Sequence, residues 1–319
     1  MTPIHSVLCP IDFSESSCGA LRYAGTVAAH FDARLTLLAV NDPLLAEAED
    51  FGGSSPRLVD DTIREMEKFY RQAFATGDKA LGDVQFDVAS GKPAPEILRV
   101  ARERGCDLIV MASHGATGFR RLFFGSTTER VLRETAVPTL VTPGGDRGPM
   151  KDDDVRRLVH RVLVPVDLTA ATPHQLLIAR GLSESFSLPL LMLHVIEPLR
   201  SMVTAHAALP PVEAERRHRV DLELEGASMA MSAGVKPEAL VAYGEPAEEI
   251  AKVANDRDAG LIVMGLHSSP LLGARMGSVT YRVLCLAHRL LLALPPEPAR
   301  AAALELHDAD VRTHAPMGR

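Results

Sequence analysis

The stretch over residues 107–131 reads DLIVMASHGATGFRRLFFGSTTERV, and it combines glycine with small and hydroxyl side chains. An apolar run ends at Met111, and the residues that could contact an anion follow it: Gly115, Gly118, Gly125, Ser126 and Thr127. Glycine has no Cβ, so it lets backbone amides approach a ligand closely. The start of the next helix offers N–H groups and a partial positive charge, which suit phosphate oxygens. The loop therefore indicates an anion site, although a connection that only needs flexible backbone would use similar residues.

Helix capping is a second interpretation of part of this loop. Ser126 is followed three residues later by Glu129, which is the spacing of a capping box at the start of a helix over 126–135. Capping accounts for Ser126 but not for the small residues around it. Arg120 and Arg121 are expected to be solvated. The spacing matches neither the P-loop motif nor the dinucleotide-binding GxGxxG motif.

Two aspartates stand at matching strand ends. Asp12 lies in VLCPIDFS, and Asp167 occupies the same place in VLVPVDLT. DFSE, at 12–15, fits a capping box, whereas DLTA keeps the acid and lacks the glutamate. The shared feature is an ionised carboxylate, which could accept hydrogen bonds from ribose or base donors. Binding and capping are compatible here, and the comparison of the two segments favours binding.

Histidine and cysteine give no sign of a catalytic residue or of a metal held by the protein. His114 and His267 match between the two segments, and a histidine in a phosphate loop more often packs or forms a hydrogen bond than acts as a base. The 12 histidines and four cysteines lack metal-ligand spacing. Scattered cysteines are typical of a reducing cytoplasm, where they act as small apolar residues.

Composition limits the classes of partner. The chain has 319 residues, 46% hydrophobic composition and a formal net charge of −7. An acidic balance disfavours binding to nucleic acid or an anionic membrane, and the absence of Trp disfavours base stacking. No uncharged apolar run reaches the ~18 residues that cross a bilayer. We therefore expect a cytoplasmic protein.

The sequence contains an internal repeat. Residues 88–114 align with 241–267 without a gap, and 15 of the 27 pairs are identical. Each copy has a length typical of one domain. The repeat predicts a first domain over 1–145, a solvated linker over 146–157, a second domain over 158–295 and a tail over 296–319.

Short apolar runs alternate with amphipathic segments in each copy. The predicted strands are 5–11, 34–40, 83–89, 107–112 and 137–142, then 161–166, 189–195, 239–243, 260–265 and 289–294. Helices are predicted near 14–31, 57–76, 94–104 and 126–135. Continuous apolar runs are typical of parallel strands buried on both faces. The alternation predicts two tandem α/β domains, each a doubly wound, mostly parallel five-stranded sheet flanked by helices. Ligands bind such sheets beyond the carboxyl ends of the strands, where the strand order reverses.

These features together resemble the universal stress protein family, in a tandem form of the ATP-binding type. The family signature is G-x-x-G, nine residues, then G-S or G-T. Here Ala112 stands at the first glycine, Gly115 is the second, 116–124 are the nine, and Gly125 and Ser126 close the motif. The resemblance covers roughly residues 3–295. It implies an adenine nucleotide alpha hydrolase-like, Rossmann-like fold.

The resemblance also implies a role for individual residues toward ATP, with any Mg²⁺ arriving on the nucleotide. Asp12, with Pro10 beside it, would face the ribose and adenine, and Val40 would line the adenine pocket. Met111 and Ala112 would pass near the ribose, and His114 stays a candidate contact. The phosphates would be held by Gly115, Gly125, Ser126 and Thr127. If the backbone φ angle at Ala112 is negative, its extra methyl group is tolerated.

The second copy departs further from the signature. Ser268 stands where the second glycine belongs, and the loop is one residue shorter and contains Pro270. We expect this copy to bind nucleotide weakly or not at all. Its candidate contacts are Asp167, Val195, Gly265, Gly277 and Ser278.

The expected function is a stress-response sensor or regulator that binds an adenine nucleotide. Two alternatives stay open: a slow ATP hydrolase, or an interaction module that has lost its ligand. Family members pair their domains through the fifth strands. The segments 137–142 and 289–294 are therefore expected to pair within the chain as a pseudo-dimer, and the sequence leaves a further homodimer open.

Overall fold

The computed structural model describes residues 4–42, 55–74, 83–114, 125–149, 152–198, 211–230, 237–266 and 277–296. The first half contains β1 (Ser6–Ile11), α1 (Glu15–Phe31), β2 (Arg34–Asn41), α3 (Ser55–Ala73), β3 (Val84–Ser90), α4 (Pro93–Glu103), β4 (Leu108–Ala112), α5 (Ser126–Glu134) and β5 (Thr139–Thr142). After α6 (Asp152–Leu158), the second half contains β6 (Val162–Pro165), α7 (Thr172–Phe186), β7 (Leu190–Ile196), α8 (Pro211–Ala230), β8 (Glu238–Tyr243), α9 (Pro246–Asp256), β9 (Leu261–Gly265), α10 (Ser278–Leu286) and β10 (Leu290–Leu294). All ten predicted strands and the four predicted helices of the first half are confirmed.

The ten strands form one sheet in the order β3-β2-β1-β4-β5-β10-β9-β6-β7-β8. Within each half the pairings are parallel, as the buried apolar runs predict. The chain moves outward from β1 to β3 and then returns to place β4 on the other side of β1. The strand order therefore reverses between β1 and β4, and likewise between β6 and β9.

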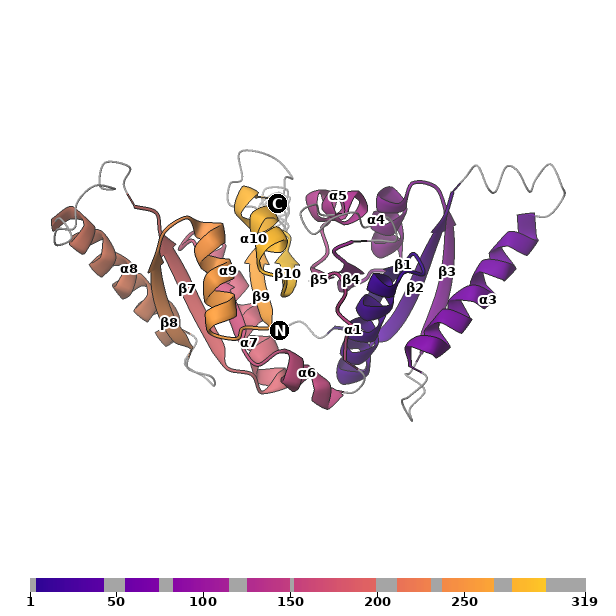
Figure 1. Cartoon of the computed structure of the whole chain (residues 1–319), viewed down its shortest axis with the longest axis horizontal. Coiled ribbons are helices and arrows are strands. Elements are labelled where there is room, and N and C mark those ends of the chain that lie inside the picture. The colour runs from indigo at the N-terminus through magenta and orange to yellow at the C-terminus, as the bar shows by residue number, and fades with distance from the viewer. Residues whose placement is uncertain are drawn as a thin grey trace, which may run out of the picture.

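The two halves are joined edge to edge by the only antiparallel pairing among the described strands. Leu291, Leu292 and Ala293 of β10 pair with Val141, Leu140 and Thr139 of β5, respectively. The predicted pairing of the fifth strands is therefore confirmed. Figure 1 shows the result: α3 and α8 lie at opposite ends of the long axis, and the joint lies between them.

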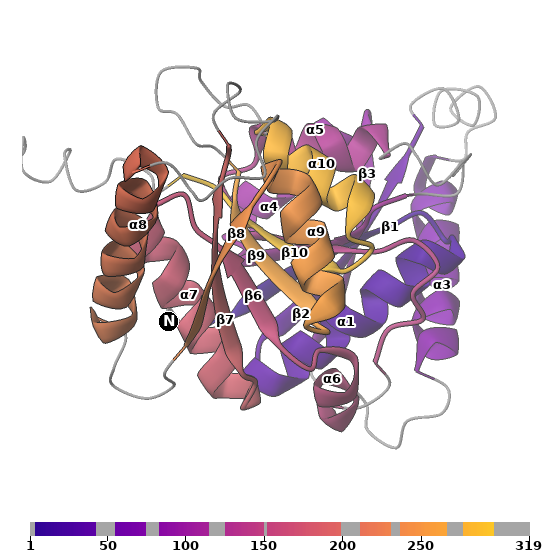
Figure 2. The same cartoon turned by 60° about the vertical axis from the view of Figure 1, so that its left-hand side comes forward.

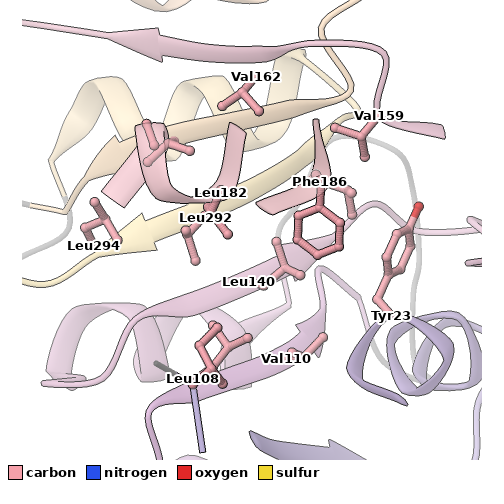
Figure 3. Packing of buried hydrophobic residues seen from close by; sticks show 14 of the residues in the cluster. Tyr23, Leu108, Val110, Leu140, Val159, Val162, Leu182, Phe186, Leu292 and Leu294 are labelled. Carbon is pink, nitrogen blue, oxygen red and sulfur yellow. The ribbon is translucent and has the colours of Figure 1, made fainter. Parts of the chain in front are cut away.

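The helices cover both faces of the sheet and enclose separate apolar clusters. One cluster contains residues of both halves, including Tyr23, Leu140, Phe186 and Leu292. Figure 3 shows these side chains gathered across the joint. On the opposite face, α4 packs against α5 and α9 packs against α10, and the latter two lie side by side in Figure 2. The face shared by α1 and α7 therefore has one core that continues from one half to the other.

The linker is more tightly packed than the sequence suggested. Tyr23 Oη in α1 donates a hydrogen bond to Asp146 Oδ2 at 2.8 Å. A Cβ added at Gly19 would collide with the Asp146 carbonyl oxygen, so the backbone of the linker lies directly on α1. Val155 of α6 is buried. Asp146 and Val155 of the linker predicted over 146–157 are therefore packed rather than solvated, because composition does not show which linker residues meet the rest of the protein.

None of the helices that the structure describes is long and apolar enough to cross a membrane.

Candidate functional site

The candidate site lies where the strand order reverses in the first half. Asp12 directly follows β1, and the loop that begins after Ala112 follows the neighbouring strand β4. Because β1 and β4 are parallel, their carboxyl ends reach the same edge of the sheet. Their backbone pairing is restricted to Val7 with Leu108 and Leu8 with Ile109, so the pairing ends well before Asp12. This is the place where open α/β sheets bind ligands.

Asp12 is exposed and is held by a local turn. Its Oδ1 accepts hydrogen bonds from Ser14 N at 3.1 Å and from Ser14 Oγ at 2.6 Å. Between them, Phe13 has a φ of 61°, a left-handed conformation that is unusual for a bulky residue. The Phe13 ring packs edge-on against Phe69 of α3, with 5.6 Å between the ring centroids. The turn is therefore fixed by the hydrogen bonds of Asp12 with Ser14 and by the packing of Phe13 on α3.

The second half repeats this turn. Asp167 Oδ1 accepts from Thr169 N at 3.1 Å and from Thr169 Oγ1 at 2.7 Å, and Leu168 has a φ of 58°. The same strained backbone at the same strand end indicates that the fold holds each carboxylate in one orientation.

Asp12 does not cap α1. The capping residue is Ser14, whose Oγ accepts from Ser17 N at 3.1 Å, and Glu15 is the first helical residue. The alternative of a capping box over 12–15 is therefore wrong. Asp12 acts one step away, by accepting from the Ser14 hydroxyl that forms the cap.

The capping box predicted at Ser126 is also wrong. Helix α5 has Gly125 as its N-cap residue, and among the described residues no side chain accepts a hydrogen bond from its first turn. The Glu129 carboxylate instead accepts from Arg133 at 2.6 Å. A helix start without a side-chain cap leaves backbone N–H groups to another acceptor. This edge of the sheet therefore carries donors that an anion could use.

Gly125 comes very close to the end of β4. Its N–H donates to the Ser113 carbonyl oxygen at 2.9 Å, and an added Cβ would lie only 3.0 Å from that oxygen. Thr128, one turn into α5, is buried and donates from Oγ1 to the Ala112 carbonyl oxygen at 2.8 Å. These contacts hold the start of α5 against the strand end. Sequence reasoning missed Thr128, although Thr280 of the second copy marks the same position and donates to Gly265 O at 3.0 Å.

The other first-half candidates have differing positions. Ala112 lies in β4, pairs with Thr142 and has no positive φ, so an alanine is tolerated there. The Met111 side chain is buried in an apolar cluster, and Val40 packs against the same cluster. Pro10 is half-buried in β1.

His114, Ser126 and Thr127 stand at the two ends of the loop. The His114 ring Nδ1 lies 2.9 Å from Ser113 Oγ and packs beside Gly144, so the described contacts of His114 are structural. Ser126 is exposed in the first turn of α5, and Thr127 beside it is half-buried. Residues 115–124, which include Gly115, lie outside the described residues, as do 267–276.

The second half differs at its equivalent edge. Gly277 N donates to Leu266 O at 2.8 Å, so the loop closes as in the first half and the missing residue falls inside it. An added Cβ at Gly277 would make an ordinary contact of 3.5 Å with Leu266 O. Gln175 of α7 is buried and donates to Pro165 O at 2.7 Å and to Val263 O at 2.8 Å. Its amide therefore bridges the strands on either side of the reversal, where the first half has Ala20.

The remaining second-half candidates lie around this bridge. Gly265 is exposed at the end of β9, Ser278 is exposed at the start of α10, and Val195 packs against an apolar cluster. Helix α10 is capped by Gly277 without a side-chain acceptor, as α5 is by Gly125. The second half thus has the same strand-end carboxylate and a helix start without a side-chain cap. Its glycine, however, lies farther from the strand-end carbonyl than Gly125 does.

Comparison with known proteins places both halves in one family. The universal stress protein family model matches residues 3–143 and 159–294. Universal stress protein MJ0531 of Methanocaldococcus jannaschii is 30% identical over 142 residues, which cover 42% of this chain and 79% of that protein. Universal stress protein MJ0577 of the same organism is 28% identical over 149 residues, covering 42% of this chain and 92% of that protein.

A solved structure shares the two-domain fold. The crystal structure of a universal stress protein from Archaeoglobus fulgidus has a TM-score of 0.63 and 21% identity, and covers 91% of this chain and 98% of that one. At this identity the likeness concerns the fold alone. The match of the family model to both halves is the stronger finding, and it shows that this chain belongs to the universal stress protein family.

Proposed function

We propose that the first half binds an adenine nucleotide and that the chain acts as a nucleotide-dependent regulator of the stress response. The phosphates would lie at the start of α5, and the nucleoside would lie toward Asp12. The observation that carries this proposal is the start of α5, which lacks a side-chain cap among the described residues and is held against β4 at the edge where the strand order reverses. Its N–H groups and partial positive charge suit a phosphate.

The residues that surround this edge fit such a ligand. Gly125 lies close to Ser113 O, and an added Cβ at 3.0 Å would make a tight contact there, so the small residue suits the close approach of α5 to the strand end. Ser126 and Thr127 add hydroxyl donors in the first turn. A carboxylate can accept several hydrogen bonds, so Asp12 can serve Ser14 and a ribose hydroxyl together. The resemblance of the loop to the family signature supports adenine as the base.

We propose that the second half binds nucleotide more weakly. Its loop is one residue shorter between the same closing contacts, and Gln175 is anchored between the strands at its reversal. We therefore expect about one tightly bound nucleotide per chain.

Calorimetric titration of the full chain with ATP tests the proposal. Asp12→Ala should weaken binding by about tenfold or more, since a lost hydrogen bond to a charged group is worth roughly 1.5–3 kcal/mol. Asp167→Ala is the matched control, because it removes the equivalent carboxylate from the second half. It should leave the tight site within about twofold of the unaltered affinity.

Two results would contradict the proposal. The first is the absence of saturable binding of ATP, ADP or AMP to the full chain. The second is equal weakening by Asp12→Ala and Asp167→Ala. Sustained phosphate release from ATP that Gly125→Val abolishes would favour the hydrolase alternative over a regulator without turnover.

A further inference from the structure

A cavity of about 630 Å³ lies between the two halves, away from the candidate nucleotide site. Helix α1 forms one wall and α7 forms the other, and β5 and β10 contribute side chains between them. The apolar side chains that line it from these four elements include Val27, Phe31, Ile178, Phe186, Leu140 and Leu292. On the first-half side, the wall also includes residues just before β1, β4 and β5, whereas Asp12 and Gly125 follow the opposite ends of their strands.

The cavity follows from how the halves are joined. Helix α1 packs mainly on β1 and β4, and α7 packs mainly on β6 and β9. The pairing of β5 with β10 places the two central strands between these helices. Figure 3 shows Leu140 of β5 and Leu292 of β10 beside Phe186 of α7 in this region. The joint therefore creates an apolar space that neither half would enclose alone.

The polar side chains of the wall already have partners inside the protein. Tyr23 Oη donates to Asp146 Oδ2 at 2.8 Å, and burial together with Asp146 raises the pKa of Tyr23. Thr26 Oγ1 donates to a carbonyl oxygen of its own helix at 2.9 Å, and Asp107 Oδ2 accepts from two backbone N–H groups. His174 also has an interaction partner. A wall of this kind offers little to water or to a charged ligand, because water needs two to four polar partners.

Size and access agree with a small-molecule site. Pockets that bind small molecules have volumes of roughly 300–1,000 Å³ and are mostly apolar. Ala136 and Pro296 line the cavity and are exposed, so they mark where it meets the surface. A ligand could bury its hydrocarbon part and leave a polar end at this opening.

We propose that the cavity between α1 and α7 binds a hydrocarbon-rich small molecule, such as a fatty acyl chain, independently of the nucleotide. Because residues of both halves form the wall, the occupied cavity would tie them more firmly together. The site depends on the tandem arrangement and requires no residue of the nucleotide site.

Titration of the full chain with the neutral apolar dye N-phenylnaphthylamine tests this proposal. We expect saturable dye fluorescence at about one dye per chain, displacement by dodecanoate, and no displacement by ATP. Ile178→Trp should fill the cavity and weaken dye binding by about tenfold or more. Leu177→Trp is the matched control, because Leu177 is the adjacent residue of α7, does not line the cavity and is 46% exposed.

Further measurements keep the test decisive. Because the chain has no Trp of its own, the emission of each variant reports directly whether the new indole is buried at position 178 and exposed at position 177. If Ile178→Trp fails to fold, Val27→Phe on the opposite wall replaces it, with the same expected loss. Equal dye binding by the Ile178→Trp and Leu177→Trp variants, or dye displacement by ATP, would overturn the proposal. Dye binding that arises only after deletion of residues 297–319 would also overturn it, since the chain's own tail would then be the occupant.

Discussion

At the scale of single residues, the candidate nucleotide site depends on two local arrangements. A left-handed residue follows each of the strand-end aspartates, so the carboxylate folds back onto the hydroxyl two positions later. Beyond β4, Gly125 lies close to a backbone oxygen, and an added Cβ would lie 3.0 Å from it. The first arrangement is shared by both halves, and the second is tight only in the first half. Of these two arrangements, the halves therefore differ in the one at the glycine before α5 or α10.

Alanine substitutions at Gly125 and Gly277 should show whether the glycine contact is tighter in the first half than in the second. Gly125→Ala places a methyl group 3.0 Å from Ser113 O, so the backbone at this contact must move apart by a few tenths of an ångström. Overpacking of this kind costs about 1–3 kcal/mol of unfolding free energy, and ATP affinity should fall with it. Gly277→Ala makes a 3.5 Å contact and should change the unfolding free energy by less than about 0.5 kcal/mol. Urea denaturation and ATP titration of the two variants measure both effects, and equal losses would contradict this account.

At the scale of elements, the positions of strands and helices were predictable and the capping of the helices was not. Runs such as LIVM, at 108–111 and 261–264, can only be buried strands in this pattern, so β4 and β9 were placed within a residue. The residue that caps α1 or α5 depends on where the backbone turns into the helix, and the serine and glutamate spacing does not contain that information. The capping box predicted at Ser126 and the alternative box over 12–15 both failed for this reason. The proposed roles of the site residues and the domain boundaries stay predictions.

The packing of the linker on α1 gives an element-scale prediction. Glycine within a helix normally destabilises it by about 1 kcal/mol relative to alanine. Gly226 in α8 has open space around its missing Cβ, so Gly226→Ala should stabilise the protein by roughly that amount. Gly19→Ala should instead destabilise it, because the new methyl group meets the Asp146 carbonyl. Thermal denaturation followed by circular dichroism compares the two, and a rise in melting temperature for Gly19→Ala would show that the linker does not rest on α1.

At the scale of the whole molecule, residues far apart in the chain share one core. The cluster on the α1 and α7 face includes Leu140 and Leu292, which meet at the joint. Such contacts could not be read from periodicity, which shows that a strand is buried but not what buries it. The cavity beside them could not be predicted from the sequence either, because its walls come from segments separated by more than a hundred positions.

A substitution at the joint should therefore affect both halves together. Leu140→Ala removes a buried side chain from the shared cluster and should cost about 2–5 kcal/mol of unfolding free energy. Urea denaturation should show one transition that moves to lower concentration for the whole chain. Leu177→Ala, at an exposed position, should have a midpoint close to that of the unaltered protein. Two separate transitions, with only one moved by Leu140→Ala, would show that the halves unfold independently.

The antiparallel pairing of β5 with β10 means that each half has the other half of the same chain as its partner. Both copies are part of one chain and are therefore made in equal number. Because β5 and β10 pair with each other, neither of these strand edges is open to another partner. Every chain therefore pairs one first copy with one second copy, so the longer loop and the shorter loop always occur together in one molecule.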